Sequence, residues 1–170
     1  MIILGIDPGT AITGYGAVSF VGSRCRALGF GSIRTAAQTP EQDRLQVIYK
    51  RTQELIAAYE PEAVCIEQLF FNKNVRSALA VGQARGVVML AAAQHGIPIF
   101  EYTPAAVKAA VTGQGRAPKQ QVGYMVRALL ALDEVPRPDD VADALAVALC
   151  HALRGKTEQM LRAAYGSDRV

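Results

Sequence analysis

The chain has 170 residues, of which 51% are hydrophobic, and its net charge is +3 at neutral pH. This length suits one globular domain, and no apolar run approaches the roughly 18–20 residues of a transmembrane helix. The first residues also lack the basic start and the cleavage site of a signal peptide. Three separated cysteines, Cys25, Cys65 and Cys150, suit buried thiols in a reducing compartment. We therefore expect a cytoplasmic protein that does not span a membrane.

The first third of the chain predicts three strands. Residues 2–7 form a β-branched apolar run that ends on Asp7 and is followed by a Pro-Gly turn signal. Residues 15–20 and 25–33 are the next strand candidates, and a short connection around Gly22 joins them as in a hairpin. These patterns place Asp7 at the carboxyl end of a buried strand.

The middle of the chain alternates between helix and strand. Apolar residues recur at three and four positions over residues 45–59, which indicates an amphipathic helix. Residues 63–66 are the next strand, and Glu67 follows it directly. Residues 74–94 are rich in small and apolar side chains and predict a helix, although its two glycines each cost about 1 kcal/mol. Such a helix permits close approach of another backbone, so it belongs either in the core or in a dimer interface.

The last part predicts one more strand and three helices. After a strand over residues 97–102, Thr103 and Pro104 form an N-cap and a first helical position. A second helix carries apolar residues over 122–130, and a third follows two prolines and faces inward over 141–152. Three early strands followed by alternating helices and strands predict an α/β sheet with an antiparallel side. We expect a domain over residues 1–155 and a polar, flexible tail over residues 156–170.

Charge is distributed unevenly along the chain. Residues 72–127 contain seven basic residues against Glu101 alone, so this segment carries +6 and the rest of the chain carries −3. A basic middle with acidic ends suits a protein that holds a polyanion near a cation site. A basic surface that is simply solvated remains the alternative.

Four acids occupy positions that are unusual for surface acids. Asp7 and Glu67 end two apolar strands, and Asp140 and Asp143, with Asp139 beside them, begin the last predicted helix. Strand ends and a helix start can converge on one cleft, where carboxylates bind hard divalent cations. Two such cations about 3.5–4 Å apart can activate water and stabilise a leaving oxygen in phosphodiester cleavage.

Each acid also has an ordinary explanation when it is taken alone. Asp7 could initiate a turn, Glu67 could form a salt bridge, and the last three could favour a helix N-terminus. Helical geometry does not choose between Asp139 and Asp140, since both lie near Asp143 on the helix. Because Asp139 follows a proline and suits an N-cap, we assign it that role and keep Asp140 for the metal.

Six segments, taken in order, resemble the RuvC family of bacterial Holliday junction resolvases. They are GIDPGT, TGYG, IEQLFFNKN, SALAVGQARG, VKAAVTGQGRAPKQQV and PDDVADALAVAL, and together they span about nine-tenths of the chain. GIDPGT alone would be weak, because actin-like kinases and ATPases also open with a strand and a D-x-G-T turn. The ordered set makes the resemblance specific.

The resemblance implies a fold, an activity and partners. The expected fold is RNase H-like, with a five-stranded mixed sheet, three antiparallel strands and then parallel strands, flanked by helices. The expected activity is metal-dependent, structure-selective endonuclease action on four-way DNA junctions by symmetric paired nicks, in recombination and repair. It implies a homodimer, two Mg²⁺ ions per site that Mn²⁺ can replace, work with the RuvA/RuvB branch-migration complex, and no nucleotide cofactor. The family's catalytic and metal-binding acids match Asp7, Glu67, Asp140 and Asp143, although some relatives have His at the Asp140 position.

Further site residues follow from the resemblance or from charge. The family's conserved basic positions match Lys108 and Lys119, which suit phosphate contact or transition-state charge, and its aromatic wedge matches Phe70. Phe71 is the alternative wedge, since two successive aromatic residues of an extended segment cannot both point inward. An exposed aromatic residue beside a metal site can stack on an unpaired base, worth about 1–3 kcal/mol. By charge alone we add four DNA-contact candidates: Lys73, Arg76, Arg85 and Arg116.

Two other function classes compete with the nuclease. An actin-like kinase or ATPase would use the D-P-G-T turn for phosphates, but it needs two such halves and a second glycine-rich loop that the sequence lacks. A DNA-binding module without chemistry would be expected to lack one of the acids. We also expect His95 to cap a helix, and His151 to lie too far from Asp140 to share a metal.

Overall fold

The computed structural model describes residues 1–68 and 75–165, with side chains for residues 1–68 and 78–154. Five strands form one sheet in the order β3-β2-β1-β4-β5. Its strands are β1 (Ile2–Asp7), β2 (Ile12–Val21), β3 (Arg24–Arg34), β4 (Ala63–Glu67) and β5 (Ile99–Tyr102). The first three pair antiparallel, and β4 and β5 extend the sheet in parallel. This confirms the predicted mixed sheet, with its last strand two residues shorter than expected.

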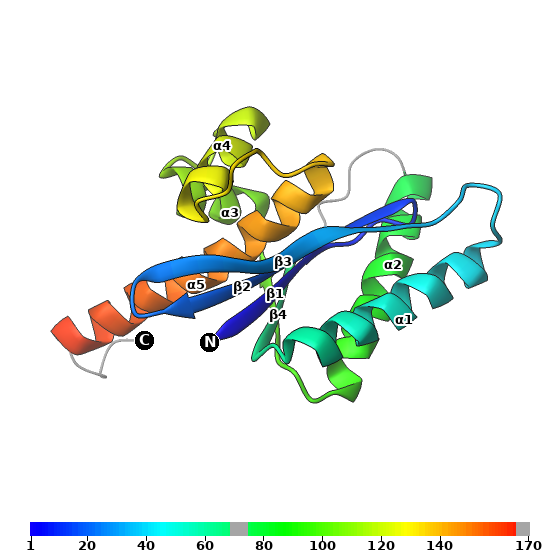
Figure 1. Cartoon of the computed structure of the whole chain (residues 1–170), viewed down its shortest axis with the longest axis horizontal. Helices are drawn as coiled ribbons and strands as arrows, with labels where there is room; N and C mark the ends of the chain where they lie inside the picture. The colour runs from blue at the N-terminus through cyan, green and yellow to red at the C-terminus, as the bar shows by residue number, and fades with distance from the viewer. Residues whose placement is uncertain (69–74, 166–170) are drawn as a thin grey trace.

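Helices cover both faces of the sheet (Figure 1). They are α1 (Glu41–Tyr59), α2 (Val75–Gln94), α3 (Pro104–Thr112), α4 (Lys119–Leu129) and α5 (Asp139–Tyr165). One apolar core joins α1 and α2 to the sheet, and the other joins α3, α4 and α5 to its opposite face. The central strand β1 contributes to both cores because Ile3 faces one and Leu4 and Ile6 face the other. A three-layer α/β arrangement follows.

Helix ends agree with the sequence at α3 and differ at α5. The Thr103 hydroxyl accepts a hydrogen bond from the Ala106 N–H at 3.1 Å, and Gly113 ends α3 with φ +79°. Asp139 was expected as an N-cap, but it is the first residue of α5, and its carboxylate accepts a hydrogen bond from Arg137 at 2.7 Å. A nearby guanidinium therefore takes the carboxylate that the sequence assigned to capping. Leu129, expected in the core, is 36% exposed at the end of α4.

Helix α5 lies against β1 and β2 with almost no space between the backbones. A methyl group on Gly5 would come within 2.0 Å of the Ala144 carbonyl oxygen, and one on Gly14 within 2.0 Å of the Asp140 carbonyl oxygen. Real side chains do not tolerate such distances, so glycine is required at both positions. These two glycines therefore allow the first turns of α5 to lie directly against the backbones of β1 and β2.

Helix α2 has a buried face and an open one. Ala84, Val88 and Ala91 are fully buried against the sheet. On the opposite side, a side chain on either of its two glycines would meet nothing within 4 Å, and two leucines are 63% and 51% exposed. These residues lie at spacings of three and four and form a continuous stripe, here called the α2 stripe: Leu79, Gly82, Gly86 and Leu90.

Helix α5 extends beyond the domain boundary that the sequence predicted. α5 runs past residue 155, where the polar tail was expected to begin, and reaches Tyr165. The side chains beyond residue 154 lie outside the described ones, so the division into a domain and a flexible tail stays a prediction. Among the described helices, no segment is long and apolar enough to cross a membrane.

Candidate active site

Two strand ends and one helix start bring the predicted acids together. Asp7 ends β1 and Glu67 ends β4, and these neighbouring strands run parallel with Ile6 paired to Ile66. Both carboxylates therefore belong to the same edge of the sheet. Asp140 and Asp143 lie in the first turns of α5, which the glycine contacts hold over this edge.

The pKa of Asp7 reports how closely these acids interact. Burial and the charges of Asp143, Glu67 and Asp140, in that order, raise the pKa of Asp7 to about 7. Burial and the charge of Asp143 also raise the pKa of Glu67. A group of carboxylates that disfavour one another's ionised forms is costly to build for stability alone.

Two lysines offset part of this negative charge. Lys119, at the start of α4, lies 2.8 Å from Asp143 and 3.6 Å from Asp139. Burial opposes its charged form, but the hydrogen bond and charge of Asp143, helped by Asp139, raise the pKa of Lys119. Lys108 on α3 and Lys119 both act to lower the pKa of Glu67. The sequence-predicted basic pair thus lies in the field of the acids.

The donor set fits a divalent metal ion, although the acids are spread out. Among the described side chains, those of residues 1–68 and 78–154, no three His, Cys, Asp or Glu residues converge closely enough to hold a metal as they stand. The repulsion that raises the pKa of Asp7 is nevertheless of the kind that a divalent cation relieves. Carboxylate oxygens are the ligands that Mg²⁺ and Mn²⁺ prefer. Charge and chemistry therefore fit a metal site.

A shallow groove of about 370 Å³ adjoins the acids. It is lined by the β1–β2 loop from Gly9 to Ile12, by α2 at Ala80 and Val81, and by Asp140. Asp140 therefore faces this groove, whereas the carboxylate of Asp139 pairs with Arg137 and Lys119. The structure gives the two neighbouring acids different surroundings, which sequence geometry alone did not do.

The family model for crossover junction endodeoxyribonuclease RuvC matches residues 3–151. The chain belongs to the RuvC family. RuvC of Pelotomaculum thermopropionicum is 57% identical over 162 residues, which cover 95% of this chain and 99% of that protein.

Solved RuvC structures share the whole fold. Thermus thermophilus RuvC superposes with a TM-score of 0.86 at 40% identity, covering 93% of this chain and 97% of that one. T. thermophilus RuvC in complex with Holliday junction substrate gives 0.85 at 38% identity, covering 92% and 96%. The yeast mitochondrial resolvase Ydc2, at 14% identity, shares the fold with a TM-score of 0.68. The expected RNase H-like fold is confirmed.

The remaining predicted DNA contacts of this RuvC family member lie in different situations. Arg116 is exposed in the loop before α4. Arg85 is only 12% exposed and is bound by Glu101, which argues against a direct phosphate contact. Phe70, Phe71 and Lys73 lie outside the described residues, and so does the side chain of Arg76. The wedge and these two basic contacts therefore stay predictions.

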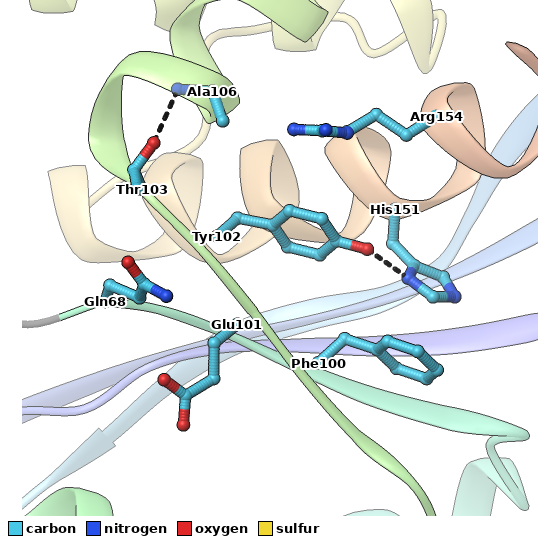
Figure 2. Close-up of a pocket in the computed structure, with 8 residues that line it drawn as sticks. All are labelled: Gln68, Phe100, Glu101, Tyr102, Thr103, Ala106, His151 and Arg154. Atoms are coloured by element: carbon cyan, nitrogen blue, oxygen red, sulfur yellow. Dashed lines mark hydrogen bonds between the residues drawn. The ribbon is translucent and has the colours of Figure 1, made fainter. Parts of the chain in front are cut away.

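A second polar region lies beside the carboxyl end of β5, next to Gln68 and farther along α5 than the acids (Figure 2). It surrounds a cavity of about 300 Å³ beside β5 and α5. The Tyr102 hydroxyl is 2.6 Å from Nδ1 of His151, whose ring packs on Phe100 with centroids 4.4 Å apart. Arg154 lies over the Tyr102 ring at 5.8 Å. His151 is thus engaged here and not with the acids, as expected from its distance along α5.

The three cysteines and His95 are the remaining residues that the sequence singled out. Cys65 and Cys150 are buried, and none of the three cysteines, all within the described residues, forms a disulfide. Burial raises the pKa of Cys65, and burial raises the pKa of Cys150 to about 11, so neither is poised as a nucleophile. His95 Nδ1 lies 2.9 Å from the Ala91 carbonyl oxygen, which confirms its role at the end of α2.

Proposed function

We propose that the chain is an endonuclease that resolves Holliday junctions by symmetric paired nicks, in recombination and DNA repair. Membership of the RuvC family supports this activity, and a RuvC structure is known in complex with Holliday junction substrate. The observation that carries it is the gathering of four carboxylates at one edge of the sheet, where the charges of the other three act on Asp7. Asp7, whose pKa is raised by the other three, lies at its centre.

The four acids would hold the metal, which we take to be two Mg²⁺ ions that Mn²⁺ can replace. When bound, the ions supply an activated water and charge stabilisation at the leaving oxygen. Asp7 and Glu67 would present their carboxylates from the sheet, and Asp140 and Asp143 from α5. Lys119 would leave Asp143 for the phosphate that enters, and Lys108 would balance charge near Glu67.

Junction recognition would use residues around this site. Phe70 or Phe71 would stack on bases near the junction centre, and Lys73, Arg76 and Arg116 would contact backbone phosphates. Work with the RuvA/RuvB complex follows from the family and stays an expectation. These contacts would position the junction, while the acids would carry the chemistry.

A homodimer would suit a substrate with two equivalent scissile sites. The α2 stripe supports this arrangement, because its glycines and exposed leucines permit close packing against a second copy of the helix. Gly86→Leu would fill the open space without touching the core. It is expected to convert the dimer to a monomer in sedimentation experiments and to abolish paired nicking, while the fold by circular dichroism stays unchanged.

One assay tests the function. Purified protein with Mg²⁺ is offered a four-way junction and a linear duplex of the same sequence. Symmetric nicking of the junction alone is expected, and Asp7→Asn should abolish it. Glu54→Gln is the matched control, since Glu54 is an acid on α1 that pairs with Arg51, and it should nick normally. Nucleotide hydrolysis without nicking would overturn the proposal, and so would junction binding without cleavage in either metal.

A further inference from the structure

Arg85 on α2 reaches two strand ends at once. One terminal nitrogen of its guanidinium donates to the backbone carbonyl of Glu67 at 2.8 Å, and the other lies 2.5 Å from the Glu101 carboxylate. Its side chain is 12% exposed and that of Glu101 is 37% exposed. The fork of one arginine therefore ties β4 and β5 to α2 at the position where the candidate ligand Glu67 leaves the sheet.

The Glu67 carbonyl needs such a donor because the sheet ends beside it. The last pair between β1 and β4 is Ile6 with Ile66, and Pro8, which follows Asp7, has no backbone N–H to continue the ladder. On the other side, the Gln68 N–H donates to the Tyr102 carbonyl at 2.8 Å. The peptide between Glu67 and Gln68 is thus fixed by β5 through its N–H and by Arg85 through its carbonyl.

The contact acts on the backbone of Glu67 and not on its carboxylate. Fixing that carbonyl fixes the last peptide plane of β4, and hence the direction in which the Glu67 side chain leaves the strand. A guanidinium can donate along both directions because its N–H groups form a rigid planar fork, whereas a lysine ammonium is a point charge on a flexible stem. The arrangement is specific to arginine.

We propose that Arg85 is a positioning residue that orients Glu67 through its paired contacts to the Glu67 carbonyl and the Glu101 carboxylate. Arg85 would thereby increase the affinity of the site for its metal. This inference rests on the proposed function, in which Glu67 is a metal ligand. Removing these two contacts frees the last peptide of β4, so one carboxylate of the proposed metal site loses its fixed orientation. Junction affinity is unaffected, because Arg85 is turned toward the two strand ends and away from solvent.

Metal binding is measured with Mn²⁺ alone, from the paramagnetic resonance signal of the free ion, and with the Mg²⁺ concentration that half-saturates single-turnover nicking. Arg85→Met should weaken Mn²⁺ binding and raise the half-saturating Mg²⁺ concentration by about 10-fold, the lower end for residues that orient metal ligands. Arg85→Lys should give a smaller loss of about threefold, because it can make one contact but not both. Glu101→Gln, which keeps the Arg85–Glu67 hydrogen bond, should fall between wild type and Arg85→Met.

Val88→Ala is the control for lost stability, because Val88 is fully buried on the same helix one turn away. It should lower the melting temperature and leave both metal readouts unchanged. Junction binding in Ca²⁺ should be equal in all variants. Arg85→Met with wild-type metal readouts and only a lower melting temperature would overturn the inference, and so would a loss of junction affinity at unchanged metal dependence. A wild-type protein that neither binds Mn²⁺ nor nicks junctions would instead overturn the proposed function.

Discussion

Helix α5 carries two polar regions that differ in how their groups are satisfied. At its start, Asp140 and Asp143 lie near Asp7 of β1 and Glu67 of β4, whose pKa values are raised by burial and by the neighbouring acids. Three turns later, His151 and Arg154 line a cavity in which a hydroxyl, an imidazole and two aromatic rings are already in contact. The same helix and sheet thus hold two different polar regions. In the first, here called the strained region, Asp7 is repelled by the acids around it. In the second, here called the settled region, the side chains of Phe100, Tyr102, His151 and Arg154 contact one another.

The difference separates chemistry from packing. Polar groups that contribute to stability are usually paired within the protein, as Tyr102 is with His151. A buried carboxylate that is destabilised by its neighbours instead marks a place where something else, here the proposed metal, would complete the site. The volume of the adjoining space does not separate the two regions. The cavity beside the settled region has about 300 Å³, and the groove beside Asp140 has about 370 Å³.

Asp7→Asn tests the strained region most directly. Nicking should fall on the order of 10³-fold or more, because a metal ligand is lost. The metal-free variant should nevertheless be more stable than wild type by about 2 kcal/mol, since a repelled buried charge is removed. That corresponds to a rise in melting temperature of roughly 4–8 °C, measured by calorimetry in a chelator.

Mg²⁺ supplies the control for this variant. It should raise the melting temperature of wild type through binding to the folded state, and raise that of Asp7→Asn much less. A metal-free variant less stable than wild type would show that Asp7 is not repelled by its neighbours. The contrast between the two regions would then have no energetic basis.

The pH dependence of stability sharpens the same contrast. Because the pKa of Asp7 is raised from 3.8 to about 7, the folded state keeps a proton between these values that the unfolded state has released. Metal-free stability should therefore fall as pH rises from about 4 to about 7 and level off above that. The raised pKa of Glu67 acts in the same direction. Urea unfolding at several pH values measures this slope, and Asp7→Asn should flatten it.

Tyr102→Phe probes the settled region and should have the smallest effect. It removes the hydroxyl that contacts His151, so we expect a loss of about 1 kcal/mol in the free energy of unfolding. Nicking rate and Mg²⁺ dependence should stay within twofold of wild type. A large change in either would mean that the Tyr102–His151 contact contributes to the chemistry, and the division drawn between the two polar regions of α5 would fail.

Local patterns predicted most of the framework. Alternating apolar runs placed Asp7 and Glu67 at strand ends, and Thr103 with Pro104 marked the start of α3, because these signals depend on neighbours in the sequence. The five-stranded mixed sheet and the RNase H-like class came from the family resemblance that the ordered motifs carry. The acids of the candidate site were therefore all visible before the structure.

Contacts between distant segments could not be predicted in this way. The sequence showed Arg85 as one more positive charge, and only the fold reveals that Glu67 and Glu101 bind it. Gly14 looked like part of a motif, and its function depends on a helix that begins 125 residues later. Asp139 was assigned to capping because it follows a proline, and only the fold shows that Lys119 lies beside its carboxylate. In each case a partner from a distant segment is set by packing and not by spacing.

The glycine contacts under α5 have a consequence for how the protein opens. β1 lies between β2 and β4, and its backbone touches that of α5 at Gly5 with no side chain between them. Elements that meet in this way cannot separate by small side-chain movements, so we expect β1, β2 and α5 to exchange their amide protons as one cooperative unit. The edge strand β5 can fray without disturbing that unit. Asp7, Asp140 and Asp143 would therefore lose their arrangement only when the whole domain unfolds.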